Sequence, residues 1–171
     1  MEQFLSVNGK EYEVLSLLGH GKGGYSYLVR LDGQEYVLKQ IHHEPCDYYT
    51  FGDKLAAELG DYERLLAASI PVPRLLEVDR EQERIVKEYI CGPTVMELTK
   101  QGLLQEAQVA QGQQMAALAR AAGLNIDYYP TNFVLQEGKL YYIDYECNEY
   151  MQQWSFDVWG SQYWKNQKEE A

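Results

Sequence analysis

The sequence predicts an α+β fold, with a strand-rich first half and a second half that begins with a helix. Two turn signals, Asn8-Gly9 and Asp32-Gly33, separate segments in which apolar and polar residues alternate, a pattern typical of β-hairpins. Apolar residues recur every three or four positions over 51–69, which predicts a helix. The stretch 105–122 is rich in alanine and glutamine and predicts a second helix.

Length and composition indicate one globular domain and exclude several function classes. The chain has 171 residues, of which 46% are hydrophobic and 24% charged. Its net charge of −11 repels a phosphate backbone, so general nucleic-acid binding is not expected. No apolar run approaches the ~20 residues that cross a membrane, and the N-terminus has no signal-like segment. Cys46, Cys91 and Cys147 are far apart, which predicts free thiols and a cytoplasmic location.

The first half is expected to consist of strands around one helix. Strands are expected over 4–7, 10–14, 25–31 and 35–41, with a further strand ending near Leu18. The segment 42–50 has a proline and no periodicity, which predicts a loop. Pro71 and Pro73 end the helix that follows. Two more strands, 75–79 and 84–90, form the next hairpin.

The second half begins after a chain break at Gly92-Pro93. Gly123 is placed to end the helix over 105–122, as glycine commonly does at the position after a helix C-cap. A short hairpin is expected from 133–135 and 140–143 across a Glu-Gly turn. The tail from Glu149 is expected to be helical.

A glycine motif lies between two expected strands and consists of Gly19, Gly21 and Gly24. A dinucleotide-binding motif would need a helix after these glycines, but a strand follows them, so that interpretation fails. A glycine-rich hairpin can instead cover nucleotide phosphates, because backbone amides can approach them closely. The alternative is a flexible hairpin turn.

Lys39 lies on the next strand between apolar residues and could hold phosphate oxygens as a point charge. The alternative for this residue alone is a surface lysine. The helix that follows offers Glu58 or Glu63 as its partner. Glu58 is favoured because it shares a helix face with Tyr62, whereas Glu63 is expected to be solvated.

The strongest signal is a loop between a helix and an apolar strand that carries Asp127 and Asn132, followed by Asp144 at the end of the next strand. Two carboxylates and an amide suit Mg²⁺, which prefers oxygen ligands. One carboxylate could act as a base while the other holds the metal. The alternative is that each residue only caps or stabilises a turn.

The order of these residues resembles that of the protein-kinase-like superfamily. Asp127-Tyr-Tyr-Pro-Thr-Asn132 is similar to the Asp-Leu-x-Pro-x-Asn of aminoglycoside phosphotransferases and of RIO-type and KEOPS-associated small kinases. Ile143-Asp-Tyr-Glu146 resembles the corresponding segment of choline kinases. Phe156-Asp-Val-Trp-Gly160 also resembles segments of these families. The resemblance covers 11–165 and suggests an atypical small bacterial kinase.

The resemblance implies a truncated bilobal fold, with an N-lobe over 1–90 and a reduced helical C-lobe over 91–171. It implies that Gly19, Gly21, Gly24 and Lys39 bind the ATP phosphates, that Glu58 orients Lys39, and that Glu88 to Ile90 meet the adenine. It also implies that Asp127 is the base and that Asn132 and Asp144 hold Mg²⁺. Asp157 is implied to brace the catalytic loop. The implied activity is transfer of the γ-phosphoryl group of ATP to a hydroxyl of a protein or a small molecule.

A second hypothesis is a nucleotide-binding pseudokinase or ATPase-like module that acts through a partner protein. Asn125 stands where these families usually have histidine, and about 27 residues follow Asp144, too few for the usual substrate platform. The retained acidic residues favour the enzyme, whereas these departures favour the module.

Two lesser features have structural alternatives. His42 and His43, with nearby acidic residues and Cys46, could suggest a metal site, but a polar loop is expected. Trp154, Trp159 and Trp164 could form an aromatic cage for a quaternary ammonium group. Packing of these rings against the core is favoured, which leaves a macromolecular acceptor or partner.

Overall fold

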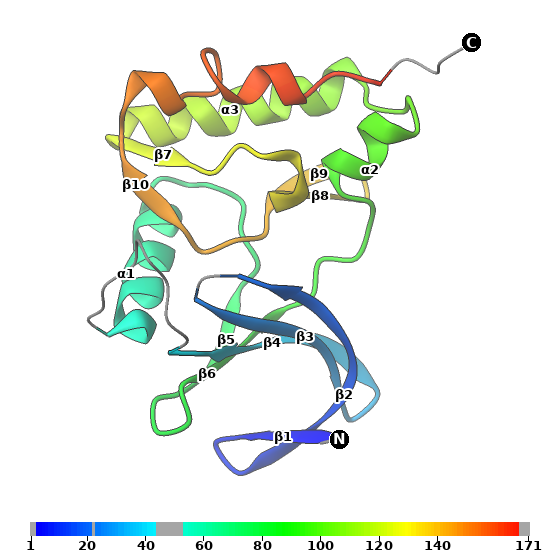
Figure 1. Cartoon of the computed structure of the whole chain (residues 1–171), viewed down its shortest axis with the longest axis vertical. Coiled ribbons are helices and arrows are strands. Elements are labelled where there is room, and N and C mark those ends of the chain that lie inside the picture. Colours follow the sequence, from blue (N-terminus) through cyan, green and yellow to red (C-terminus); the bar gives the residue numbers. More distant parts are fainter. Residues whose placement is uncertain (1–2, 22, 44–52, 168–171) are drawn as a thin grey trace. The chain divides into compact units, whose positions relative to one another are not determined.

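The computed structural model confirms a mixed α+β fold and describes residues 3–21, 23–43 and 53–167 (Figure 1). The chain divides into two compact units. The first unit comprises Met1–Ala57 and Pro73–Tyr89, and the second comprises Glu58–Val72 and Ile90–Ala171.

The first unit is built on a curled antiparallel sheet of six strands, in the order β1-β2-β3-β4-β6-β5. The strands are β1 (Phe4–Val7), β2 (Lys10–His20), β3 (Gly24–Leu31), β4 (Gln34–Ile41), β5 (Leu75–Asp79) and β6 (Arg84–Glu88). β2 is longer than either predicted segment because bulges, between Val14 and Ser16 and between Leu17 and Gly19, allow it to continue beside β3.

Both predicted Gly turns in this sheet are confirmed. Asn8 and Gly9 have φ values of 50° and 81°, and Asp32 and Gly33 have φ values of 51° and 78°. Two successive positive φ values define a type I′ turn, whose twist matches that of the strands it joins. The sheet buries one cluster of apolar side chains: Val7, Tyr12, Val29, Leu38 and Val86.

Helix α1 (Lys54–Ala67) starts after Asp53, whose carboxylate accepts a hydrogen bond from the backbone of Ala56 at 3.0 Å. It ends before Ser69, which has a φ of 64° and donates its amide to the Leu66 carbonyl. The helix therefore stops four residues before the first of the two prolines, Pro71. The expected loop 42–50 lies outside the described residues from position 44 onward.

Among the described residues, the second unit contains α1 from Glu58 onward, two further α-helices and two small antiparallel sheets. Its further elements are α2 (Val95–Lys100), α3 (Glu106–Ala121), β7 (Leu124–Ile126), β8 (Phe133–Gln136), β9 (Lys139–Tyr142) and β10 (Cys147–Glu149). β8 pairs with β9 as predicted, while β7 pairs with β10. Gly123 follows α3 with a φ of 75°, which confirms its predicted role after the C-cap.

Three features of the second unit were not expected from the sequence. Helix α2 starts at a capping box in which Thr94 and Glu97 bond each other's backbone amides, a signal that is visible in the sequence. The β7–β10 pair has only three residues in each strand, too few for an alternation pattern. The tail forms two short 3₁₀ helices, Gln152–Trp154 and Gly160–Tyr163, in place of the expected longer helix.

In the part of the chain that the structure describes, no helix combines the length and hydropathy needed to cross a membrane.

Candidate functional site

The glycine motif forms the turn between β2 and β3. The amide of Gly21 donates to the carbonyl of Gly24 at 2.9 Å, which closes the turn. A Cβ on Gly24 would collide with the Gln40 carbonyl oxygen, so this position requires glycine. A Cβ on Gly19 or Gly21 would meet no atom within 4 Å, so the turn borders open space.

The Lys39 amine lies beside this glycine turn. A Cβ built on Gly23 would lie 3.6 Å from the Lys39 Nζ. Lys39 is half-buried on β4 and is paired with Ser26 on β3. The first unit thus brings together two of the predicted phosphate-binding features, the backbone of the turn and a cationic side chain.

His42, which follows β4, forms polar contacts with the glycine turn. Its Nε2 lies 2.7 Å from the Gly21 carbonyl oxygen, and its amide donates to the Gly23 carbonyl at 3.1 Å. The ring of His20 stacks on Tyr25 at 4.1 Å, and both rings contact the His42 ring edge-on. Among the residues that the structure describes, no three His, Cys, Asp or Glu side chains could together hold a metal ion. His42 supports the turn, whereas the His43 Nε2 lies 2.7 Å from a Glu83 carboxylate oxygen. Cys46 lies outside the described residues.

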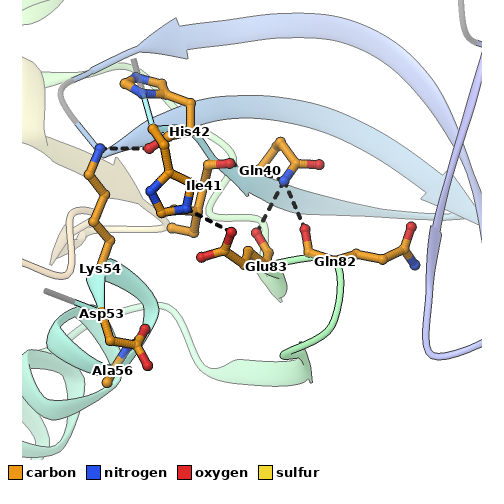
Figure 2. A network of polar contacts seen from close by, with 9 residues as sticks. Gln40, Ile41, His42, Asp53, Lys54, Ala56, Gln82 and Glu83 are labelled. Carbon is orange, nitrogen blue, oxygen red and sulfur yellow. Dashed lines mark hydrogen bonds and ion pairs between the residues drawn. The ribbon is translucent and has the colours of Figure 1, made fainter. Parts of the chain in front are cut away.

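Figure 2 shows how polar contacts hold the end of β4, from Gln40 to His42. The buried Lys54 at the start of α1 donates its Nζ to the His42 carbonyl at 2.6 Å. Gln40 donates its Nε2 to the carbonyls of Gln82 and Glu83 at 3.0 and 3.3 Å. These contacts fix the strand end that follows Lys39, and sequence patterns alone did not reveal them.

The residue predicted to pair with Lys39 and the segment predicted to meet the adenine are divided between the two units. Glu58 is buried and belongs to the second unit, whereas Lys39 belongs to the first, so their pairing stays a prediction. Glu63 is exposed, as expected. Glu88 accepts a hydrogen bond from the Arg74 amide at 3.1 Å, and Ile90 is buried. One boundary between the units falls between Tyr89 and Ile90.

Asp127 and Asn132 lie together on the loop after β7. Tyr129 donates its amide to the Asp127 Oδ1 at 3.1 Å, which holds the carboxylate in an Asx turn. Asn132 donates its Nδ2 to the Asp127 carbonyl at 3.3 Å. The amide of Ile143 donates to the Asn132 carbonyl at 2.9 Å, which places Asp144 next along the chain from this contact.

Tyr142, the last residue of β9, bonds to this loop, and the sequence analysis did not identify it. Its hydroxyl accepts from the Asp127 amide at 3.1 Å and donates to the Glu146 carbonyl at 2.8 Å. Burial raises the pKa of Tyr142 well above its usual value, and the nearby Asp144 carboxylate raises that pKa further. Tyr142 therefore stays protonated and links the Asp127 loop to the segment after Asp144. The sequence feature that could have identified Tyr142 is its position at the end of a strand in which apolar and polar residues alternate.

The donor set near Asn132 fits a magnesium ion. An amide oxygen from Asn132 and a carboxylate from Asp144 are hard oxygen ligands. Mg²⁺ is commonly held by one or two such groups together with substrate phosphates and water, so a dedicated cluster of protein carboxylates is not needed. Both side chains are half-buried, which leaves them partly accessible.

The predicted bracing role of Asp157 stays a prediction. Asp157 is exposed and lines a cavity of about 330 Å³ with Arg120 and with Tyr128 of the Asp127 loop. The same loop is held by Trp164, which donates its indole Nε1 to the Tyr128 carbonyl at 2.8 Å. Asn125, at the position where histidine is usual, is buried and donates its Nδ2 to the Met151 carbonyl at 2.8 Å.

The three tryptophans have different surroundings, so the packing interpretation is confirmed for only part of the set. Trp164 is buried at 3% exposure and contacts Phe133 and Phe156. Trp154 is 50% exposed and Trp159 is half-buried. The three rings do not form one cage.

Comparison with known proteins supports the resemblance carried by these residues. The chain is related to the protein-kinase-like superfamily through distant homology. It is 27% identical over 129 residues to the KEOPS complex subunit Bud32 of Pyrococcus abyssi. The match covers 74% of this chain and 59% of that relative, so the chain spans less than two thirds of the relative's length. No family model matches the sequence.

Proposed function

We propose that this protein is an ATP- and Mg²⁺-dependent phosphotransferase with a reduced bilobal kinase-like fold, in which 1–90 form the N-lobe and 91–171 the C-lobe. The observation that carries the proposal is the group formed by Asp127, Asn132 and Tyr142 next to Asp144. Several hydrogen bonds position these residues, and their chemical types are those that phosphoryl transfer requires. The distant homology to Bud32 supports the same class.

In the first unit, the glycine turn and Lys39 would bind the ATP phosphates. The backbone of Gly19 and Gly21 borders open space, where phosphate oxygens could approach. The Lys39 ammonium beside Gly23 would neutralise part of their charge. The segment Glu88 to Ile90 would meet the adenine, and Glu58 would orient Lys39.

In the second unit, Asp127 would accept the proton of the acceptor hydroxyl, and Asn132 and Asp144 would hold Mg²⁺. The ion supplies charge neutralisation at the transferred phosphoryl group. The Tyr129 amide and the Tyr142 hydroxyl hold Asp127 in one orientation, which lowers the entropic cost of the reacting geometry.

A second candidate is a nucleotide-binding module that works through a partner protein. Asn125 favours it, because its side chain is buried and bonded to the tail at the position where histidine is usual. The relative is named as a subunit of a complex, which also favours a partner.

Thermal melting with and without MgATP tests nucleotide binding. We expect MgATP to raise the Tm, because a ligand that binds only the folded state stabilises it. Lys39→Ala should remove most of that shift. No shift and no binding heat for the wild-type chain at millimolar MgATP would overturn both candidate functions.

Substitution of the two aspartates separates binding from turnover. Asp144→Asn should abolish Mg²⁺-dependent nucleotide binding, because a neutral amide is a poor ligand for this ion. Asp127→Asn should keep nucleotide binding and lose phosphate release or autophosphorylation. Binding by the wild-type chain without any turnover would favour the partner-dependent module, and equal loss of binding in both variants would show that the assigned roles are wrong.

A further inference from the structure

Four exposed or half-exposed aromatic rings form a continuous row that begins beside Asp127. Tyr129 contacts Tyr163, Tyr163 contacts Trp159, and Trp159 contacts Trp154, with ring centroids 5.3, 5.3 and 5.8 Å apart. Every contact is edge-to-face, with interplanar angles of 65° to 73°. We call Tyr129, Trp159, Tyr163 and Trp154 the aromatic row.

The core of the second unit does not require the aromatic row. Tyr129, Tyr163 and Trp154 are 38%, 37% and 50% exposed. The core is filled by a different set of rings, all at most 3% exposed: Tyr128, Phe133, Tyr142, Phe156 and Trp164. Large aromatic side chains that remain on the surface in a contiguous group commonly mark a binding site.

Tyr129, at one end of the row, forms a backbone hydrogen bond with the candidate base, Asp127. The Tyr129 amide donates to the Asp127 carboxylate at 3.1 Å, so the residue that carries the first ring is bonded to that carboxylate through its backbone. A ligand that lies along the row would have its Tyr129 end two residues along the chain from Asp127.

The charge near the row selects the kind of ligand. The segment from Asp144 to Trp164, which carries three of the four row residues, has four carboxylates, Asp144, Glu146, Glu149 and Asp157, and no Lys, Arg or His. The cation Arg120 lines a cavity with one of these carboxylates, Asp157. The whole chain carries a net charge of −11. Acidic groups and the negative faces of aromatic rings attract cations and repel phosphate backbones.

The spacing of the row indicates an extended chain with several cations. Successive centroids are 5.3 to 5.8 Å apart, somewhat shorter than the roughly 7 Å between alternate side chains on one face of an extended peptide. A single small cation would need rings that surround it, whereas the contacts of these rings run from each ring to the next.

We propose that the aromatic row binds the basic side chains of an extended protein segment that carries the phosphoryl-acceptor hydroxyl. This inference rests on the proposed function, because it assigns the acceptor class of the same site. Lys and Arg side chains lie against the rings by cation–π interaction, and the acceptor Ser or Thr lies at the Tyr129 end, next to Asp127.

The test measures binding of two synthetic peptides to the full chain by fluorescence anisotropy. One peptide contains a serine flanked by Arg and Lys, and the other has Gln in place of each basic residue. We expect the basic peptide to bind more tightly, and Trp159→Ala and Trp154→Ala each to weaken it about three- to tenfold. Trp154 is the more exposed of the two, so its variant keeps the test valid if Trp159→Ala fails to fold.

The matched control is Leu103→Ala, which removes an apolar side chain that is 58% exposed and outside the row. This control should bind the basic peptide like the wild-type chain. Equal affinity for both peptides, equal loss in the Leu103 control, or preferential binding of a single-stranded oligonucleotide would overturn the inference.

Parallel measurements of MgATP turnover by the wild-type chain separate this inference from the proposed function. Phosphorylation of the basic peptide that depends on the row supports both. Turnover of MgATP without preference for the basic peptide overturns only the inference. If the peptide binds in a row-dependent way but the protein turns over no MgATP, the proposed phosphotransferase function fails. The peptide is then not a phosphoryl acceptor, and this part of the inference is overturned.

Discussion

Two sets of aromatic rings in the second unit come from the same segments but have opposite surroundings. Tyr128 is 1% exposed, whereas its neighbour Tyr129 is 38% exposed. Trp164 is 3% exposed, whereas Tyr163 before it is 37% exposed. Adjacent residues in irregular segments point to different sides, so one ring of each pair enters the core and the other joins the aromatic row.

Burial distinguishes the buried set from the exposed row, whereas ring spacing is similar in both. Phe156 contacts Tyr128 and Trp164 with centroids 5.5 and 5.2 Å apart, and Trp164 contacts Phe133 at 4.9 Å. Glycine makes room for these rings: a Cβ on Gly160 would lie 2.6 Å from the Tyr128 Cβ. A tryptophan in this unit can therefore be buried or exposed, depending on the residues that pack around it.

The largest effect that separates the two sets is expected for Trp164→Ala. This change removes a buried ring and the indole hydrogen bond to the Tyr128 carbonyl. We expect the free energy of unfolding to fall by about 3–5 kcal/mol, the usual cost of truncating a large core ring. Chemical denaturation with urea measures this loss. A loss below about 1 kcal/mol, typical of a surface site, would contradict the assignment of Trp164 to the core.

A smaller effect is expected where a methyl group is added beside the Trp164 ring. A Cβ on Gly112 in α3 would lie 2.7 Å from the ring, whereas one on Gly60 in α1 would meet no atom within 4 Å. Alanine is favoured over glycine inside a helix by about 1 kcal/mol, so Gly60→Ala should stabilise the protein by up to that amount. Gly112→Ala should destabilise it by roughly 1–2 kcal/mol because overpacking exceeds this gain.

The two glycine variants are compared by the midpoint of urea denaturation. Opposite signs are the expected result, because the two positions share helix propensity and differ in the space around them. Stabilisation by both variants would show that Trp164 does not press against α3.

The sequence predicted most strands and turns of the fold because short-range chemistry determines them. Asn8-Gly9 and Asp32-Gly33 need no distant partner to favour a type I′ turn, and both form it. The β7–β10 pair was not predicted, because three-residue strands are stabilised by a partner about 20 positions away and have no pattern of their own. The tail is irregular because tertiary contacts, such as that of Gly160 with Tyr128, override local preference.

The sequence indicated the candidate site residues, but it did not indicate the residues that position them. Asp127, Asn132 and Asp144 stand out because their order and spacing match a known pattern. Tyr142 and His42 position the loop and the glycine turn through hydrogen bonds that connect residues far apart or involve backbone atoms. Such contacts have no spacing signal, so the structure was needed to identify the supporting roles of these two residues.

Alkaline pH should affect the buried rings through their hydroxyl groups. Burial raises the pKa of Tyr128 from 10.0 to about 12, and burial also raises the pKa of Tyr142. A raised folded-state pKa means that the neutral hydroxyl contributes stability below pH 10, which is lost as the pH rises toward 12. The free energy of unfolding should fall across this range, and less steeply in Tyr128→Phe. An equal fall in both proteins would show that Tyr128 does not contribute.

The smallest stability effect is expected for Trp154→Ala, the exposed counterpart of Trp164→Ala. Trp154 is 50% exposed and contacts Trp159 through one ring edge, so its removal opens no cavity in the core. We expect the free energy of unfolding to change by no more than about 0.5 kcal/mol, as at other surface positions. Urea denaturation under the conditions used for Trp164→Ala gives a direct comparison. A loss of several kcal/mol would place Trp154 in the folding core, and weaker peptide binding by this variant would then reflect unfolding. A change near zero together with weaker binding would mean that a surface ring is kept for contact with a ligand.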